Sequence, residues 1–147
     1  FDGVEHVMND TLTSNEELRS YSSIDAWFSR PQTHEYILWY GKQRVDVKKI
    51  PLRCIVTDTS ISRKYLQDDY PDAENNHELS HFRWLPKDIQ VFSNEINIYD
   101  NKMAIVCIGK KELLGIIIES ESIVETQKSI FEVAWRASEK SMWELNI

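Results

Sequence analysis

The stretch VFSNEINIYDNKMAIVCIGKKELLGIIIE, residues 91–119, decides the fold of this chain. It holds three runs rich in β-branched residues, and short turn-forming segments at Asp100-Asn101 and Gly109–Lys111 separate them. Closely spaced runs of this kind predict consecutive strands. We therefore expect an antiparallel meander whose strands are Val91–Tyr99, Met103–Ile108 and Leu113–Glu119.

Three other segments have the spacing of an amphipathic helix, with apolar residues three and four positions apart. The first opens the chain, and its stripe is Val4, Val7, Met8, Thr11 and Leu12. The second covers residues 33–48, with Tyr36, Ile37, Tyr40, Arg44 and Val47 on one face. The third begins at a capping box formed by Ser122 and Glu125 and continues to about Lys140.

Two strands are expected before the meander, at Leu18–Ser22 and in LRCIV, residues 52–56. LRCIV is apolar on both faces, which is typical of a strand inside a sheet that helices cover. A further strand is expected in FRWL, residues 82–85, whereas the polar region 61–80 is expected to contribute no core. The prediction is a single α/β domain over residues 1–147, with a mixed sheet, an antiparallel C-terminal meander and flanking helices.

Composition limits the function. The chain has 147 residues and a net charge of −7, so phosphate backbones and anionic membranes would be repelled. No apolar run is long enough for a membrane span. Cys54 and Cys107 lie in apolar runs and are expected to be reduced and buried. A cytoplasmic setting without direct contact to nucleic acid or membrane is the expectation.

The segment HELSH, residues 77–81, fits the H-E-x-x-H pattern in which two histidines on one helix face bind zinc. Its context is unfavourable, because NN precedes it and the strand-like FRWLP follows it. No third ligand stands out. We expect no metal and no cofactor, and a zinc-dependent hydrolase that uses HELSH stays the alternative.

The start of the meander raises the question of a site. Alternation along a strand places Ser93, Glu95, Asn97 and Tyr99 on one face. Such a polar row is either the solvated face of an ordinary strand or the lining of a pocket. The strand pattern alone leaves both interpretations open.

A resemblance favours the pocket. The run EINIYDNKMAIVCIGKKELLGIIIESESIVETQKSIFEVAWRAS, with LRCIVTDTS and FRWLP before it, resembles the C-terminal effector domain of TrmB-type transcriptional regulators, which has a phospholipase D-like fold. The resemblance extends from the first helix to about Lys140, and GIIIES to IFEVAW is its most specific part. It implies an effector-sensing domain that forms a homodimer.

Active phospholipase D relatives carry an H-x-K-x-x-x-x-D motif on this strand. If Asp100 matches the motif's Asp, Ser93 stands where the nucleophilic His would be and Glu95 where the Lys would be. A serine without a positioned base is a weak nucleophile, and a carboxylate repels a phosphodiester. The resemblance therefore implies a domain that is not an enzyme.

The sequence predicts a ligand site made of Ser93, Glu95, Asn97 and Arg83, with Arg83 expected beside Glu95. A small-molecule effector, a sugar or another polar metabolite, is the expected ligand. DNA would be contacted only through an N-terminal winged-helix module outside this chain. Trp27, Trp39 and Trp143 are candidates for a dimer interface. A purely structural dimerisation module is the second alternative.

Overall fold

The computed structural model describes residues 1–72, 78–89, 94–140 and 144. Its helices are α1 (Asp2–Thr11), α2 (Ile24–Trp27), α3 (Pro31–Lys42), α4 (Ser60–Lys64) and α5 (Glu121–Ala137), with π-helical segments η1 (Gln43–Lys48) and η2 (Tyr65–Asp69). Its strands are β1 (Leu18–Ser22), β2 (Leu52–Val56), β3 (Ser80–Trp84), β4 (Asn94–Tyr99), β5 (Lys102–Ile108), β6 (Leu113–Glu119) and β7 (Glu139–Lys140). Among the described helices none is both long and apolar enough to cross a membrane.

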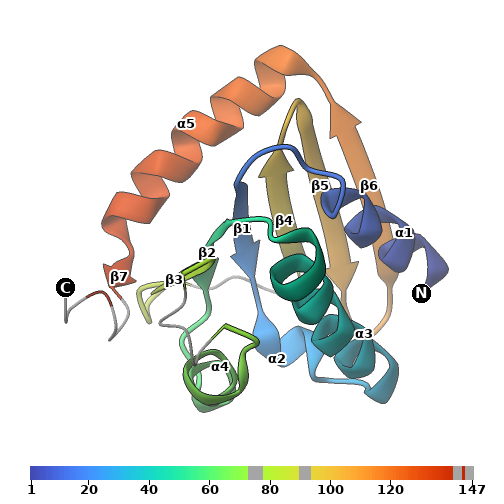
Figure 1. The fold of residues 1–147 in the computed structure, drawn as a ribbon, viewed down its shortest axis with the longest axis vertical. Coiled ribbons are helices and arrows are strands. Elements are labelled where there is room, and N and C mark those ends of the chain that lie inside the picture. The colour runs from blue at the N-terminus through green and yellow to red at the C-terminus, as the bar shows by residue number, and fades with distance from the viewer. Residues whose placement is uncertain (73–77, 90–93, 141–143, 145–147) are drawn as a thin grey trace.

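One mixed sheet of seven strands organises the domain, in the order β6-β5-β4-β1-β2-β3-β7 (Figure 1). The strands β1, β2 and β3 are parallel to one another, with Ser20 opposite Cys54 and Cys54 opposite Phe82. The strands β4, β5 and β6 form the predicted antiparallel meander, and β4 joins it to β1 with Asn97 opposite Ser20. The predicted α/β class and mixed sheet are confirmed.

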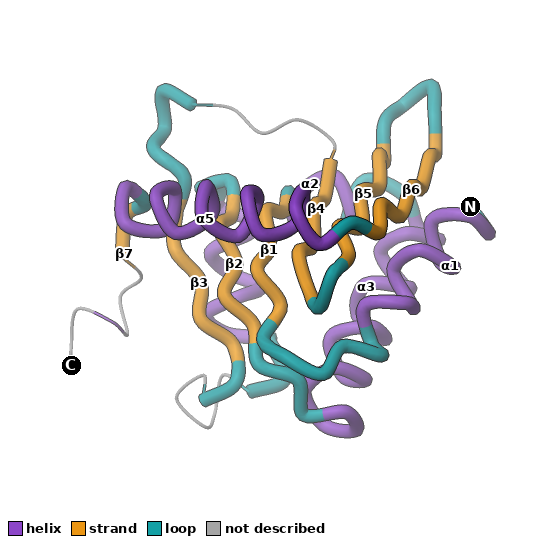
Figure 2. The backbone as a smooth tube through the Cα atoms, turned by 90° about the horizontal axis from the view of Figure 1, so that it is seen from above, coloured by secondary structure: helices purple, strands orange, loops and turns teal. Residues whose placement is uncertain are grey.

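Helices cover both faces of this sheet (Figures 1 and 2). The larger core lies between the sheet and α1, α2, α3 and η2, and it contains Met8, Trp27, Tyr40, Leu66 and Phe82. The smaller core lies under α5, where Phe131 and Trp135 pack near Ile55 and Ile98. Glu95 and Asn97 point into the larger core, because β4 alternates its side chains between the two layers.

Arginines contribute to the contact between α5 and the sheet. Arg53 on β2 lies over the rings of Phe131 and Trp135, at 5.3 and 5.4 Å from the centroids, and Arg83 on β3 lies 4.3 Å from the Trp135 centroid. Arg53 also donates to both carboxylate oxygens of Glu132. These cations keep contact with carboxylates while their planes cover aromatic surface.

The structure corrects five details of the sequence prediction. Cys107 is only partly buried, whereas Cys54 is buried as expected. The Oγ of Ser120, and not Ser122, accepts the cap hydrogen bond of α5 from the backbone N–H of Ile123. Val47 is 60% exposed, because α3 continues into η1, whose wider turns shift the helical stripe, and Val45 is buried instead. The short helix α2 was not predicted. Region 61–80 does contribute core, through Tyr65, Leu66 and Tyr70.

The contact between α1 and β6 depends on Gly115. A Cβ at this position would lie 2.7 Å from Cγ2 of Val7 and 2.9 Å from the carbonyl oxygen of Gly3. We therefore expect Gly115→Ala to lower the free energy of unfolding by about 1 to 3 kcal/mol, the usual cost of overpacking. Urea denaturation measures the change.

Gly3→Ala is the matched control, because Gly3 lies in α1 and nothing lies within 4 Å of the Cβ it would gain. It should leave the stability unchanged or raise it by up to about 1 kcal/mol, since alanine favours the helix more than glycine does. Equal stabilities of the two variants would contradict the close approach of α1 to β6.

Candidate ligand cavity

A buried carboxylate stands at the centre of the candidate site. Glu95 on β4 is only 6% exposed. Its Oε1 accepts hydrogen bonds from Ser22 Oγ at 2.6 Å and from Trp27 Nε1 at 2.9 Å. Its Oε2 accepts one from Asn97 Nδ2 at 2.9 Å. Three donors from β1, α2 and β4 thus compensate for much of the hydration that the carboxylate loses on burial.

The local sequence explains how these donors meet. Ser20 and Ser22 follow Leu18 at alternate positions of β1, so all three point into the same layer. Ser23 then caps α2, its Oγ accepting from the backbone N–H of Ala26, and this helix turns the indole of Trp27 towards β4. The polar group therefore results from one strand-to-helix turn next to β4.

Glu95 and Asn97 line a cavity of about 40 Å³ between the sheet and the helices α2 and α3 with η2. A volume of this size accommodates about three water molecules. Four aromatic rings and four polar side chains form most of the wall. The lining residues are Ser20, Ser22, Ile24, Ile37, Tyr40, Leu52, Cys54, Tyr65, Tyr70, Phe82, Glu95 and Asn97.

A buried cation lies behind one wall of this cavity. Arg44 is fully buried and donates to the carbonyl of Ile50 at 2.6 Å, to the hydroxyl of Tyr70 at 3.0 Å and to Ser80. Its Nε has no hydrogen-bond partner among the described residues. Since Tyr70 lines the cavity, Arg44 holds one of the aromatic rings of the wall in place.

Burial and charge act in opposite directions on Glu95. Removal from water raises the pKa of Glu95, and the hydrogen bonds from Ser22, Asn97 and Trp27, together with the charge of Arg44, lower it. Burial is the larger effect, so the pKa lies above its ordinary value of 4.5. Burial also raises the pKa of the Cys54 thiol, which keeps this cavity residue protonated and unreactive.

The predicted site residues divide into three groups. Glu95 and Asn97 lie together, and both line the cavity. Ser93 lies outside the described residues. Arg83 does not lie beside Glu95 as expected, because the register of β2 and β3 places it on the opposite face of the sheet. There it donates to the carbonyl of Trp135 at 2.8 Å and pairs with Glu144 at 3.1 Å.

The HELSH segment is only partly described. His77 lies outside the described residues, Glu78 is exposed, and His81 is half-buried in β3. Within the part of the chain that the structure describes, no three His, Cys, Asp or Glu side chains are grouped as metal ligands would be. The absence of a metal stays a prediction.

Sequence reasoning did not identify Ser22, Trp27, Tyr70 and Cys54 as neighbours of Glu95. One signal was available, since LRSYS places two serines on the inward face of a strand that starts with leucine. A second signal in the sequence was Arg44, which the helical pattern places on the same buried face as Tyr40. A buried arginine requires acceptors inside the protein, so it indicates a polar region in the core.

Comparisons with known proteins identify the class of fold. TrmBL2, an archaeal chromatin protein with a novel mode of DNA binding, matches with a TM-score of 0.57 and 14% identity over 95% of this chain and 52% of TrmBL2. NucT from Helicobacter pylori matches with a TM-score of 0.61 and 11% identity over 95% of this chain and 91% of NucT. This chain thus spans about half the length of TrmBL2. No family model and no curated protein matches the sequence.

At these identities the matches show a shared fold. They relate this α/β domain structurally to a TrmB-type protein, which agrees with the coarse part of the resemblance. The phospholipase D-like assignment, the effector role and the homodimer stay predictions.

The raised pKa of Glu95 leads to a prediction on stability. Protonated Glu95 contributes its full stability below about pH 4.5, the ordinary pKa of a glutamate, which applies to the unfolded chain. This contribution is lost as the pH rises through the higher pKa of Glu95 in the folded protein. Glu95→Gln stays neutral, and the Asn97 amide can turn over to accept from it. We expect the unfolding free energy of wild type to fall relative to the variant from about pH 4 to pH 8, by about 1.4 kcal/mol per unit of raised pKa.

Urea denaturation at several pH values measures this difference. Glu121→Gln at the exposed start of α5 is the control, and it should follow the pH profile of wild type. Parallel pH profiles for Glu95→Gln and wild type would show that the carboxyl does not titrate differently in the folded protein.

Proposed function

We propose that this domain is a non-catalytic effector-sensing and dimerisation domain of a TrmB-type transcriptional regulator. Its effector binds in the cavity at Glu95 and Asn97. DNA contact belongs to a winged-helix module N-terminal to this domain, and the net charge of −7 supports that separation because it disfavours direct contact with phosphates.

The observation that carries the proposal is the buried Glu95 carboxylate beside a cavity. A polar cluster in a core is costly to maintain, since apolar residues of the same volume pack there at no desolvation cost. Ser20, Ser22, Asn97 and Glu95 together offer donors and acceptors on one wall, opposite aromatic rings. Sites for small polar ligands have this composition, with an apolar lining and few placed polar groups.

The composition of the wall supports binding without catalysis. The described residues that line the cavity include no lysine or arginine, so no cation for a phosphate lies on the wall. Glu95 is the carboxyl group there that could act as a base, and both of its oxygens already accept hydrogen bonds from Ser22, Trp27 and Asn97. Cys54 is the strongest potential nucleophile there, and its raised pKa keeps it as a thiol.

The cavity volume limits the effector. As it stands, about 40 Å³ holds a molecule of a few heavy atoms, so a sugar requires the cavity to open. Tyr65 is the ring best placed to move, because it belongs to η2, whereas Arg44 holds Tyr70 and the polar wall is part of the central sheet. Such a movement at η2 would convert ligand binding into a conformational change.

A ligand screen tests the cavity. Polar fragments and sugars of increasing size are screened by thermal shift against wild type and Glu95→Gln. We expect ligands that raise the melting temperature of wild type, and we expect Glu95→Gln to weaken their binding by about 1 to 3 kcal/mol, the cost of a mismatched buried polar contact.

Glu121→Gln again serves as the matched control, since it removes the same charge at an exposed position. It should keep every hit. If Glu95→Gln keeps the same hits with the same shifts, the cavity is not the effector site.

Exposed apolar side chains support the dimer. On α5, Ile123, Ile130 and Val133 are 46%, 51% and 66% exposed, and Leu114 and Ile116 of β6 are also exposed. A second copy of the chain, packed against this surface in a homodimer, would bury these side chains. The tryptophans are poorer candidates than expected, because Trp27 is fully buried and Trp143 lies outside the described residues, which leaves Trp39.

Static light scattering at micromolar concentrations tests the interface. Wild type should have the mass of a dimer, and Val133→Lys should have that of a monomer with an unchanged free energy of unfolding at fixed pH, because Val133 is largely exposed. Ile61→Lys is the control, since Ile61 is also exposed, at 45%, and lies on α4 at the other face of the sheet. A wild-type monomer, or a Val133→Lys dimer, would remove the claim for α5.

A further inference from the structure

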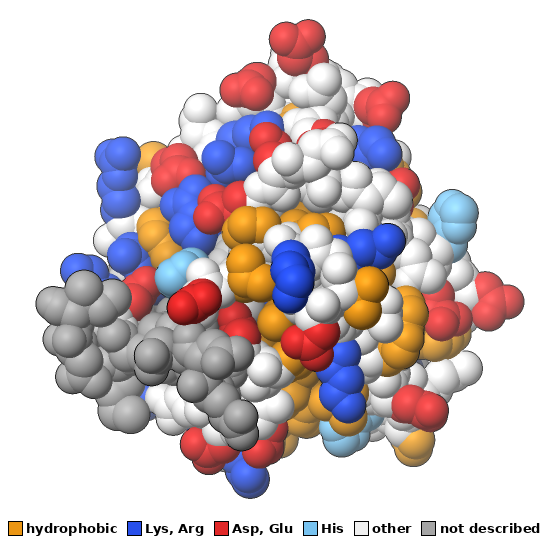
Figure 3. All heavy atoms as spheres, viewed as in Figure 1, with side chains coloured by type: hydrophobic (Ala, Val, Ile, Leu, Met, Phe, Trp, Pro, Cys, Tyr) orange, Lys and Arg blue, Asp and Glu red, His pale blue; other side chains and the backbone are white. Residues whose placement is uncertain are grey.

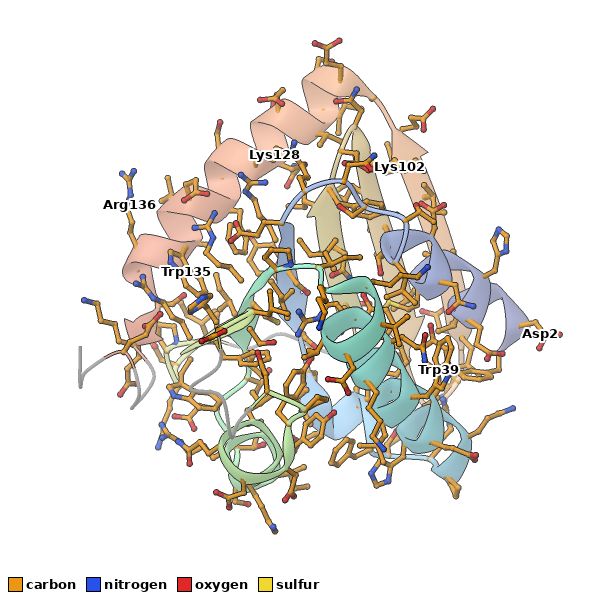
Figure 4. The ribbon with its side chains drawn as sticks, viewed as in Figure 1. Asp2, Trp39, Lys102, Lys128, Trp135 and Arg136 are labelled. Atoms are coloured by element: carbon orange, nitrogen blue, oxygen red, sulfur yellow. The ribbon has the colours of Figure 1, made fainter. Side chains whose placement is uncertain are left out.

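A second concave surface lies between α1 and α3, on the outer side of the helical layer. Figure 2 shows these two helices side by side, and Figure 4 labels Asp2 on α1 and Trp39 on α3. The groove has a volume of about 470 Å³, which is within the usual range of about 300 to 1,000 Å³ for small-molecule sites. It is more than ten times larger than the buried cavity at Glu95.

Three aromatic rings form the floor of this groove. Phe1 meets Tyr36 edge to face, with centroids 5.9 Å apart at 83°, and Tyr36 lies 5.6 Å from Trp39 at 43°. Trp39 is 45% exposed, although tryptophan is usually well buried. Phe1 and Trp39 therefore offer aromatic surface to a ligand, whereas Tyr36 is only 6% exposed and supports them from the core side.

The charged side chains around this floor are all acidic. Asp2, Glu5 and Glu35 line the groove. No lysine, arginine or histidine of the described chain forms an ion pair with any of them. Figure 3 shows acidic side chains next to hydrophobic atoms at this end of the molecule, where Figure 1 has the N-terminus.

The helix dipole explains why two of these three acidic residues lie where they do, and leaves the third unexplained. Asp2 and Glu5 lie in the first turn of α1, where negative side chains stabilise the helix. Glu35 lies in the fifth position of α3, where this effect has faded, yet it faces the same groove. The three carboxylates thus converge on the aromatic floor from two helices.

Aromatic faces and carboxylates share one preferred ligand. A ring attracts a cation through the negative charge over its face, and carboxylates add to that attraction at longer range. A quaternary ammonium group fits the ring best, because it is weakly hydrated and loses little hydration when it lies over an aromatic face. Anions are repelled, and a neutral group gains only apolar contact.

We propose that the groove between α1 and α3 binds a small organic cation that carries a quaternary ammonium group. The positive head lies over Trp39, whose ring Tyr36 supports from the core side, and Glu35 and Asp2 face it from the rim. This site is separate from the cavity at Glu95, so its test does not depend on the effector proposal.

Choline and 3,3-dimethyl-1-butanol, its uncharged carbon analogue, are the probes, titrated at constant ionic strength. The indole N–H signal of Trp39 is followed by NMR on the 147-residue chain and assigned through Trp39→Leu. We expect a saturable shift with choline and at least about fivefold weaker binding of the neutral analogue, which has the same shape without the charge.

Variants distinguish the contribution of the Trp39 ring from that of the Glu35 charge. Trp39→Leu, followed through backbone amides of α1 and α3, should abolish saturable binding, Trp39→Phe should restore part of it, and Glu35→Gln should weaken it severalfold. Glu121→Gln, an exposed change on α5, should bind choline as wild type does. Equal binding of choline and its neutral analogue, no saturation in wild type, or an unchanged affinity in Glu35→Gln would each overturn the proposal.

Discussion

The structure depends on how the Glu95 carboxylate is accommodated inside the larger core. Its three hydrogen-bond donors come from β1, α2 and its own strand, so the carboxylate fixes the distance between the sheet and α2. Losing Asn97 would leave Oε2 without its donor, and losing Ser22 or Trp27 would leave Oε1 with one donor in place of two. A buried acceptor that lacks its donor costs more than the hydrogen bond itself contributes. Ser22, Trp27 and Asn97 are therefore constrained together.

The two faces of the sheet handle charge in different ways. On the face of the larger core, Glu95 and Arg44 are deeply buried and bound to neutral donors and acceptors. On the face of α5, Arg53 and Arg83 are partly exposed and combine carboxylate partners with aromatic contacts. Ion pairs that water reaches contribute little stability each, so α5 is held mainly by Phe131, Trp135 and their apolar neighbours.

The features that the sequence could predict are those that depend on a repeat within one segment, such as the alternation of side chains along a strand. Glu95 and Asn97 share a face because side chains alternate along any strand, and β4 follows that rule whatever its neighbours are. The meander was predictable since short turns join its strands. The error with Arg83 has the opposite origin. Its face depends on the register of β2 with β3 and on the sheet order, and both are set by contacts between distant segments.

The same limit applies to the cavity. Tyr65 and Tyr70 come from a polar stretch whose apolar residues are too few for a periodic pattern. They reach the core because Tyr70, just after η2, meets Phe82, and Tyr65 packs against Tyr70 and Phe28. No pattern within that segment indicates the sheet against which it packs. Trp27 likewise belongs to a four-residue helix, too short for a helical repeat to be detected.

An aromatic series connects the two proposed sites. Tyr36 contacts Trp39 on its outer side and stacks on Trp27 on its inner side, with centroids 5.9 Å apart at 28°. The indole of Trp27 then donates to Glu95. The hydroxyl of Tyr36 is held by Oδ1 of Asn9 at 2.7 Å, so the ring cannot turn without breaking that hydrogen bond. Any shift of Tyr36 would reach Glu95 through one intervening side chain, because close-packed rings have no free space to absorb it.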